Sequence, residues 1–154
     1  MLQVQQIAPA FSSVNQAGKT ISLADFKGKQ NVILYFYPKD DTPGCTIEAN
    51  EFTALASEFA KAETIILGVS KDDCGSHQAF IDKFGLKVDL LADTDGSLCD
   101  AYGVWQLKEK NGVSKMGIVR STFVINKKGI LEEAIYQVAP EGHAQAMLAR
   151  VQGL

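Results

Sequence analysis

The sequence predicts an α/β fold: one domain, residues 1–154, with a central mixed β-sheet flanked by helices. Length and composition indicate one compact domain, because 154 residues with 46% hydrophobic and 21% charged side chains can bury a single core. Strand-like and helix-like patterns alternate through residues 32–102, which is typical of parallel strands joined by right-handed helical crossovers. Two β-rich runs and a helix then complete the chain, so a mixed sheet is expected.

Each expected element rests on a local pattern. The continuous apolar run at residues 32–37 indicates a buried strand, and the helix that follows repeats apolar residues at spacings of three and four. Asn126 and Gly129 suit a turn between two hairpin strands, and Pro140 suits the first position of the last helix. The expected strands are residues 20–23, 32–37, 64–69, 88–91, 119–125 and 130–136. The expected helices are residues 45–61, 76–84, 97–102 and 140–150.

Charge and hydropathy exclude several classes of protein. Fifteen basic and 18 acidic side chains give a net charge of −3, and no local run is basic, so nucleic acid is not an expected partner. No stretch approaches the ~20 apolar residues of a membrane span, and the N-terminus lacks a charged and apolar export signal. Three cysteines, an odd number, favour the reducing cytoplasm and chemistry or core packing over structural disulfides.

The most informative segment is residues 37–48, between the first buried strand and the long helix. Thr42 before Pro43 is typical of a helix N-cap, which places Cys45 in the first helical turn. The positive end of the helix dipole stabilises a thiolate there, and the thiolate is the reactive form. This predicts a nucleophilic or redox cysteine, with a small buried hydrophobe as the alternative. Glu48 and Glu51 stand where a thioredoxin-type second cysteine and a phosphate-loop arginine would be needed.

The segment FYPKDDTPGCTIEA, residues 36–49, closely resembles the active-site motif of peroxiredoxins, in particular the Q-type or bacterioferritin comigratory protein subgroup. The matches continue with LGVSKD, SHQAF, LCDAYGVW and RSTFVI, which together cover essentially the whole domain. The resemblance implies a thioredoxin-like fold with an N-terminal extension. It also implies a thiol-dependent peroxidase, an antioxidant enzyme of cell redox homeostasis, that reduces hydrogen peroxide and organic hydroperoxides.

The same resemblance assigns a role to each residue of the motif. Cys45 is expected to attack the O–O bond and become a sulfenic acid. Thr42 is expected to hydrogen-bond the peroxide, and Pro38 to shield the pocket from water. Arg120 is expected to stabilise the thiolate and the developing charge, with Glu48 orienting its guanidinium. Arg120 also stands out without the resemblance, because it is one of two arginines and lies in an apolar run where a charge needs a partner; the alternative is an edge-strand arginine that reaches into solvent.

The chain lacks a second, resolving cysteine at the positions where the family usually carries one. Many Q-type members carry a resolving cysteine five residues after the first, where this chain has Asn50; others carry it at about Ile81. We therefore expect first a single-cysteine cycle, completed by an external thiol such as thioredoxin, glutaredoxin or a low-molecular-weight thiol. Cys74 is the second choice of resolving residue, because it should leave the sheet at the same edge as Cys45. Cys99 is a distant third and is expected to be core.

No cofactor or metal site is expected. Cys74 and His77 have the spacing of half a zinc site, but no second pair follows, and no Gly-rich phosphate loop is present. His77 and His143 are interpreted as polar residues early in their helices. Two other functions stay open at this point: a redox-inactive thioredoxin-fold binding module or holdase, and a general disulfide oxidoreductase. Q-type relatives suggest a monomer, with no membrane partner.

Overall fold

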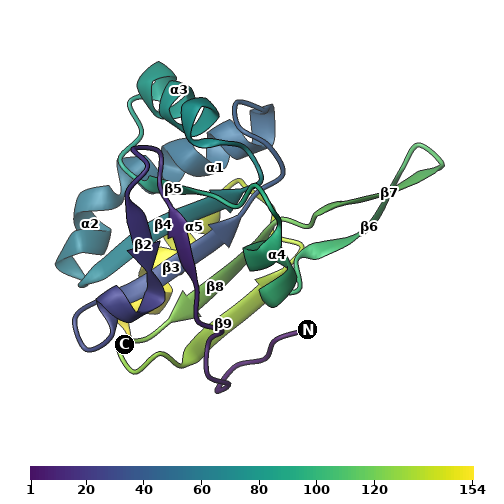
Figure 1. Ribbon diagram of the computed structural model, residues 1–154. Helices are drawn as coiled ribbons and strands as arrows, with labels where there is room; N and C mark the ends of the chain where they lie inside the picture. Colours follow the sequence, from purple (N-terminus) through teal and green to yellow (C-terminus); the bar gives the residue numbers. More distant parts are fainter.

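A five-stranded mixed sheet lies at the centre of the computed structural model, which describes residues 1–154 (Figure 1). The strand order is β5-β4-β3-β8-β9. These strands are β3 (Asn31–Phe36), β4 (Thr64–Ser70), β5 (Asp89–Ala92), β8 (Ser121–Ile125) and β9 (Leu131–Tyr136). β3, β4 and β5 run parallel, and β8 is antiparallel to both of its neighbours, so the predicted mixed sheet is confirmed.

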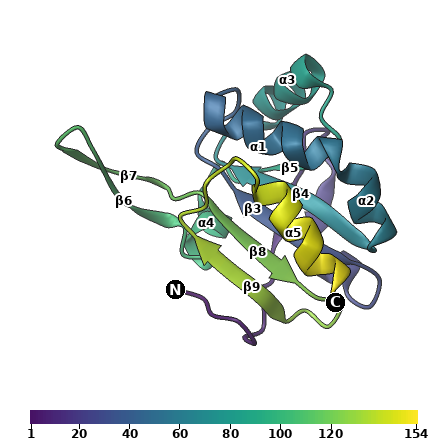
Figure 2. The same ribbon diagram turned by 180° about the vertical axis from the view of Figure 1, so that it is seen from behind.

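Helices and a small second sheet cover the two faces. Four helices pack on one face, which Figure 2 shows from the front: α1 (Pro43–Ala54), α2 (Ala56–Lys61), α3 (Cys74–Phe84) and α5 (His143–Gln152). The other face carries α4 (Ser97–Ala101), the 3-10 helix η1 (Leu23–Phe26) and the antiparallel pair β1 (Ser12–Val14) and β2 (Thr20–Ser22). No helix is both long and apolar enough to cross a membrane.

The central strand β3 contributes to both hydrophobic cores. All six of its residues are buried, and successive side chains point to opposite faces of the sheet. Val32, Leu34 and Phe36 therefore pack beneath α4 and η1, whereas Ile33 and Tyr35 pack beneath α1 and α5. This explains why the strand reads as an unbroken apolar run, and it fixes the position of the loop that follows it.

Three of the expected elements differ in their bounds in ways that affect the site or its supports. The expected helix at residues 45–61 is two helices, since the chain leaves helical geometry at Leu55. The last helix begins at His143 rather than at Pro140, because Gly142 takes a left-handed conformation (φ 76°) and forms the N-cap. Arg120 lies just before β8 instead of inside a strand.

A hairpin that the sequence analysis did not predict projects from the body of the protein. It consists of β6 (Trp105–Lys110) and β7 (Val113–Ile118), paired antiparallel, and Figure 1 shows it extending away from the central sheet. Most of its residues are exposed, so the sequence lacks the buried alternation that normally reveals a strand. The predicted turn between β8 and β9 at residues 126–129 is confirmed, with Gly129 at φ 81° and its N–H bonded to the Asn126 carbonyl.

Candidate active site

The loop from β3 to α1 delivers Cys45 to a helix N-terminus. Thr42 is the N-cap of α1 and Pro43 its first residue, as the sequence predicted. The first helical hydrogen bond runs from the Thr46 N–H to the Thr42 carbonyl, so the N–H groups of Gly44 and Cys45 precede the bonding pattern of the helix. These N–H groups and the helix dipole favour a negative charge on the sulfur of Cys45.

Arg120 joins the two acidic groups of the site. Its Nη2 donates to Cys45 Sγ over 3.3 Å, and its Nη1 donates to Glu48 Oε1 over 2.8 Å. The side chain of Arg120 is only 15% exposed, so the alternative of an arginine reaching into solvent is wrong. β8 pairs directly with β3, which brings a residue 75 positions away to the first turn of α1. The backbone is also held, because the Val138 N–H donates to the Arg120 carbonyl over 2.8 Å.

Gly44 allows the guanidinium to come this close to the helix. A Cβ atom at position 44 would lie 3.0 Å from Arg120 Nη2 and 3.5 Å from a ring carbon of Pro140. A side chain at position 44 would therefore crowd the guanidinium of Arg120 next to the sulfur. This packing role of Gly44 follows from the contact with Arg120, 76 positions away, and no local pattern in the sequence indicates it.

Glu48 is fully buried beneath the guanidinium. Desolvation raises its pKa to about 7, against the opposing effect of the positive charge on Arg120. Its second oxygen, Oε2, has no hydrogen-bond partner. One guanidinium thus contacts both the Cys45 sulfur and the buried Glu48 carboxyl group.

Thr42 and Pro38 are placed less tightly than Cys45. The Thr42 hydroxyl donates to the Lys39 carbonyl over 2.9 Å and does not cap the helix, so its oxygen lone pairs stay available. Thr42 lies one turn before Cys45. Pro38 sits at the start of the same loop with an exposed side chain. The structure thus joins Cys45, Arg120 and Glu48 by direct contacts, with Thr42 beside them and Pro38 further out on the loop.

All three cysteines are free, but their surroundings differ. Cys45 is 1% exposed, Cys99 is fully buried, and Cys74 is partly exposed at the first position of α3. Because β3 and β4 are parallel neighbours, Cys45 and Cys74 leave the sheet at the same edge, as predicted. Burial, followed by the adjacent Asp93 carboxylate, raises the pKa of Cys99 far above its ordinary value. This confirms the expectation that Cys99 is a core residue.

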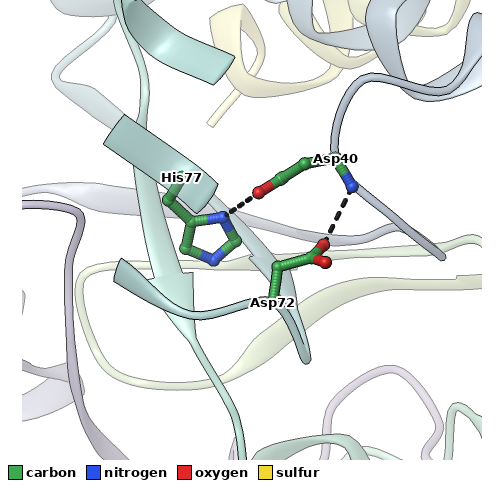
Figure 3. Close-up of side chains that lie close together, drawn as sticks. All are labelled: Asp40, Asp72 and His77. Carbon is green, nitrogen blue, oxygen red and sulfur yellow. Dashed lines mark hydrogen bonds and ion pairs between the residues drawn. The ribbon is translucent and has the colours of Figure 1, made fainter. Parts of the chain in front are cut away.

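Two histidines are buried, contrary to the interpretation of both as simple polar residues of their helices. His77 is fully buried, with Nδ1 2.7 Å from Asp40 (Figure 3). His143 is 8% exposed, and its Nε2 lies 2.8 Å from the Thr122 hydroxyl oxygen. The spacing of His77 to Phe80 was a usable signal, because residues three apart share a helix face and Phe80 is core.

Asp40, Asp72 and His77 also form a donor set of the kind that binds metal ions, with ligand atoms within 4.8 Å of one another. Protein groups already use these atoms, however. Both Asp40 oxygens accept hydrogen bonds from neighbouring side chains, and Asp72 Oδ2 accepts from the Asp40 N–H over 2.8 Å and from the Ser70 hydroxyl over 2.7 Å. The cluster therefore fits an internal hydrogen-bond network better than a metal site.

Comparison with known proteins agrees with this geometry. The AhpC/TSA family profile matches residues 4–134. Peroxiredoxin Bcp of Bacillus subtilis is 41% identical over 96% of this chain and 93% of its own. The structure of peroxiredoxin Q from Xylella fastidiosa superimposes with a TM-score of 0.92 at 33% identity, covering 99% of this chain and 97% of that one.

Peroxiredoxin Q of Xanthomonas campestris gives a TM-score of 0.88 at 40% identity, over 93% and 90% of the two chains. The thioredoxin-like fold predicted from the sequence resemblance is thereby confirmed, and so is the expected thiol-dependent peroxidase function. The chain belongs to the AhpC/TSA family, within the Bcp or Q group of the peroxiredoxins.

Proposed function

We propose that Cys45 carries out the peroxidase reaction. The thiolate sulfur attacks one oxygen of a hydroperoxide, the O–O bond breaks, and the sulfur becomes a sulfenic acid. The other oxygen leaves with the electron pair of the broken bond and takes up a proton, giving water or an alcohol. The contact of 3.3 Å between Arg120 Nη2 and Cys45 Sγ is the observation that carries this proposal, because it places a fixed positive charge at the reacting sulfur.

The neighbouring residues have separate roles in this reaction. Arg120 stabilises the thiolate and then the charge on the breaking bond. The free N–H of Cys45 and the hydroxyl of Thr42 bind the peroxide oxygens. Glu48 holds the guanidinium in place through its 2.8 Å bond to Nη1. Pro38, at the start of the same loop with an exposed side chain, borders the entrance of the site and limits the access of water.

We propose hydrogen peroxide and organic hydroperoxides as substrates. Trapped intermediate and ligand complex structures of the Xanthomonas campestris bacterioferritin comigratory protein, 39% identical over 93% of this chain, concern the alkyl peroxide reduction activity of that protein. The reaction at Cys45 makes no demand on the group attached to the leaving oxygen. The same chemistry therefore serves both classes.

An external thiol completes the cycle in this proposal. Asn50 and Ile81 replace the cysteines that other members use, and the remaining buried thiol, Cys99, is unreactive where it lies. Thioredoxin, glutaredoxin or a low-molecular-weight thiol then reduces the Cys45 sulfenic acid, in a monomeric protein of the cytoplasm. Cys74 is the second candidate, because it leaves the sheet at the same edge as Cys45.

The test is the intact mass of the reduced protein after one equivalent of hydrogen peroxide, with and without a sulfenic-acid trap. A trap adduct on Cys45 without a disulfide supports external resolution. A loss of two hydrogens with a Cys45–Cys74 peptide would replace it with an internal cycle. Peroxide consumption in the presence of dithiothreitol should disappear in Cys45→Ser and persist in Cys99→Ser. Full peroxidase activity of Cys45→Ser would contradict the proposal. If the protein were instead a holdase, Cys45→Ser and Cys99→Ser would both suppress the aggregation of a client protein as well as the wild type does.

A further inference from the structure

A buried hydrogen-bond network ties the loop before Cys45 to α3 (Figure 3). Asp40, in this loop, accepts from the Tyr37 hydroxyl at 2.5 Å, the Ser76 hydroxyl at 2.8 Å and His77 Nδ1 at 2.7 Å. Its backbone N–H donates to Asp72 over 2.8 Å. Four bonds thus hold one residue of the loop, and three of the four partners lie between β4 and the first turn of α3.

His77 is the only member of the network that also reaches β5. Its Nε2 lies 2.8 Å from the Leu91 carbonyl, which can only accept, so Nε2 carries a proton. Burial alone would raise the pKa of Asp40, but the hydrogen bonds from His77 and Tyr37 outweigh it and lower the pKa below its ordinary value. The Asp40 carboxylate therefore accepts hydrogen bonds from both sides, and His77 connects it to β5 through its two ring nitrogens.

The loop beyond Asp40 needs such an anchor. Asp41 has a φ of 59°, a left-handed conformation that is unfavourable for a non-glycine residue. Outside the network, its carboxylate pairs with Lys83 at 2.7 Å on an exposed part of the surface. Thr42 follows immediately as the N-cap of α1. The position of Asp40 thus determines where Thr42 and the first turn with Cys45 lie.

The two halves of the catalytic cycle place opposite demands on this loop. Reaction with a small peroxide needs the folded first turn, in which Arg120 contacts the sulfur. Reduction of the sulfenic acid by a larger thiol needs access to a sulfur that is 1% exposed in this conformation. A contact that holds the loop closed therefore favours the first step and slows the second.

We propose that the buried hydrogen bond between Asp40 and His77 is the positioning element that balances these two steps: it holds the loop in place for the reaction with peroxide and must release it before a thiol reaches the oxidised sulfur. The proposal rests on the role given to Cys45 above. It assigns Asp40 and His77 a function through Thr42 and the first turn of α1, without contact to the substrate.

The test uses Asp40→Asn and His77→Gln in the full-length protein. We expect the rate constant for oxidation of Cys45 by hydrogen peroxide to fall about tenfold or more, because small misplacements of reacting groups are costly. We expect the rate constant for the reaction of the Cys45 sulfenic acid with reduced glutathione, a thiol much larger than hydrogen peroxide, to rise by a similar factor. Ser76→Ala, which removes one of the four bonds, should shift both rates in the same directions by less, and it serves if the stronger variants do not fold.

The matched control is Leu131→Ala, a cavity in the core on the opposite face of the sheet. The free energy of unfolding of each variant is measured in urea, and the rate constants are compared at urea concentrations at which the control and the network variants are equally stable. The control should leave both rate constants within about twofold of wild type. If the network variants change the two rates in the same direction, or no more than this control does, their role is only structural and the proposal is wrong.

Nitrogen NMR of the wild-type protein gives an independent check. A hydrogen bond between His77 Nδ1 and Asp40 is expected in the reduced protein, and its absence would contradict the proposal. Failure of the positioning role can be distinguished from failure of the catalytic role proposed for Cys45. If Cys45→Ser retains peroxidase activity, the proposed catalytic role fails; if Cys45 is essential but the two rates do not diverge, only the positioning role fails.

Discussion

One guanidinium, that of Arg120, holds the Cys45 sulfur at 3.3 Å with Nη2 and the Glu48 carboxylate at 2.8 Å with Nη1. Two acidic groups thus share one positive charge in a buried site. The arrangement requires the planar fork of arginine, since one ammonium group does not present two divergent donors in fixed directions.

Arg120→Lys should lower the rate of Cys45 oxidation by peroxide about 100-fold or more, because a preorganised donor at the developing charge is lost. Arg150→Lys is the matched control. Arg150 is the other arginine, paired at the surface with Glu132 and Glu133, and its substitution should leave the rate unchanged. Stopped-flow oxidation of the reduced proteins measures both. Equal rates in the two variants would contradict the role of Arg120.

The Thr42 hydroxyl offers a sharper comparison. Thr42→Val keeps the shape and removes the hydroxyl, so the peroxide rate should fall about tenfold to a hundredfold. Thr42→Ser keeps the hydroxyl and should retain most of the rate. The same rapid-mixing assay distinguishes them, and similar losses in both would mean that shape, rather than the hydroxyl, matters at this position.

Glu48 predicts a pH dependence of stability. Its pKa is raised from 4.5 to about 7 in the folded protein, so between these values the folded state binds more protons than the unfolded state and stability falls as pH rises. The loss amounts to about 3 kcal/mol at most. Glu48→Gln lacks this loss. Both proteins are unfolded in urea in a Cys45→Ser background between pH 4.5 and pH 7. The free energy of unfolding of the protein with Glu48 should fall relative to that of Glu48→Gln as the pH rises, and a difference that stays constant would contradict the raised pKa.

His143 predicts the opposite trend. Burial, and next the charge of Arg120, lower its pKa from 6.5 to about 4, so the folded protein keeps it neutral. Below pH 6.5 the unfolded chain binds a proton that the folded protein does not, and stability is lost as pH falls toward 4. His143→Gln should remove this part of the acid sensitivity. Unfolding curves on either side of the window measure it, and an unchanged acid limb would show that His143 is not responsible.

The three cysteines should separate by their reaction with an alkylating agent. Cys74 is partly exposed and should be modified in the native protein, whereas Cys99 is buried, with its pKa raised, and should react only after unfolding. Mass spectrometry of peptides after a short treatment gives the order. Rapid native labelling of Cys99 would mean that α4 opens far more readily than its packing indicates.

The sequence was most informative where one local rule dominates. Thr42-Pro43 at the end of an apolar run predicts the start of α1, and this places Cys45 in the first turn. A rare arginine in an apolar context needs a partner, which Glu48 and Cys45 provide. The first inference needs only the residues within one helical turn of Cys45. The second needs only the rule that a buried charge must have a partner.

Other features depend on contacts between distant segments and could not be predicted in this way. Asp40 and His77 are 37 positions apart, and each alone resembles an ordinary polar residue. Pro140 was expected to open the last helix, but a left-handed Gly142 delays its start to His143. The β6–β7 hairpin has little buried surface, so its strands leave no alternating pattern in the sequence.

That hairpin offers a practical route for engineering. Its tip combines Asn111 (φ 55°) and Gly112 (φ 77°) in a turn directed away from the central sheet, and the surrounding side chains are exposed. Exposed turns of this kind tolerate inserted polypeptide. A fluorescent reporter or an affinity peptide placed between Asn111 and Gly112 would leave both chain termini free and the β3–α1 loop untouched, which makes the tip a natural attachment point for a peroxide biosensor.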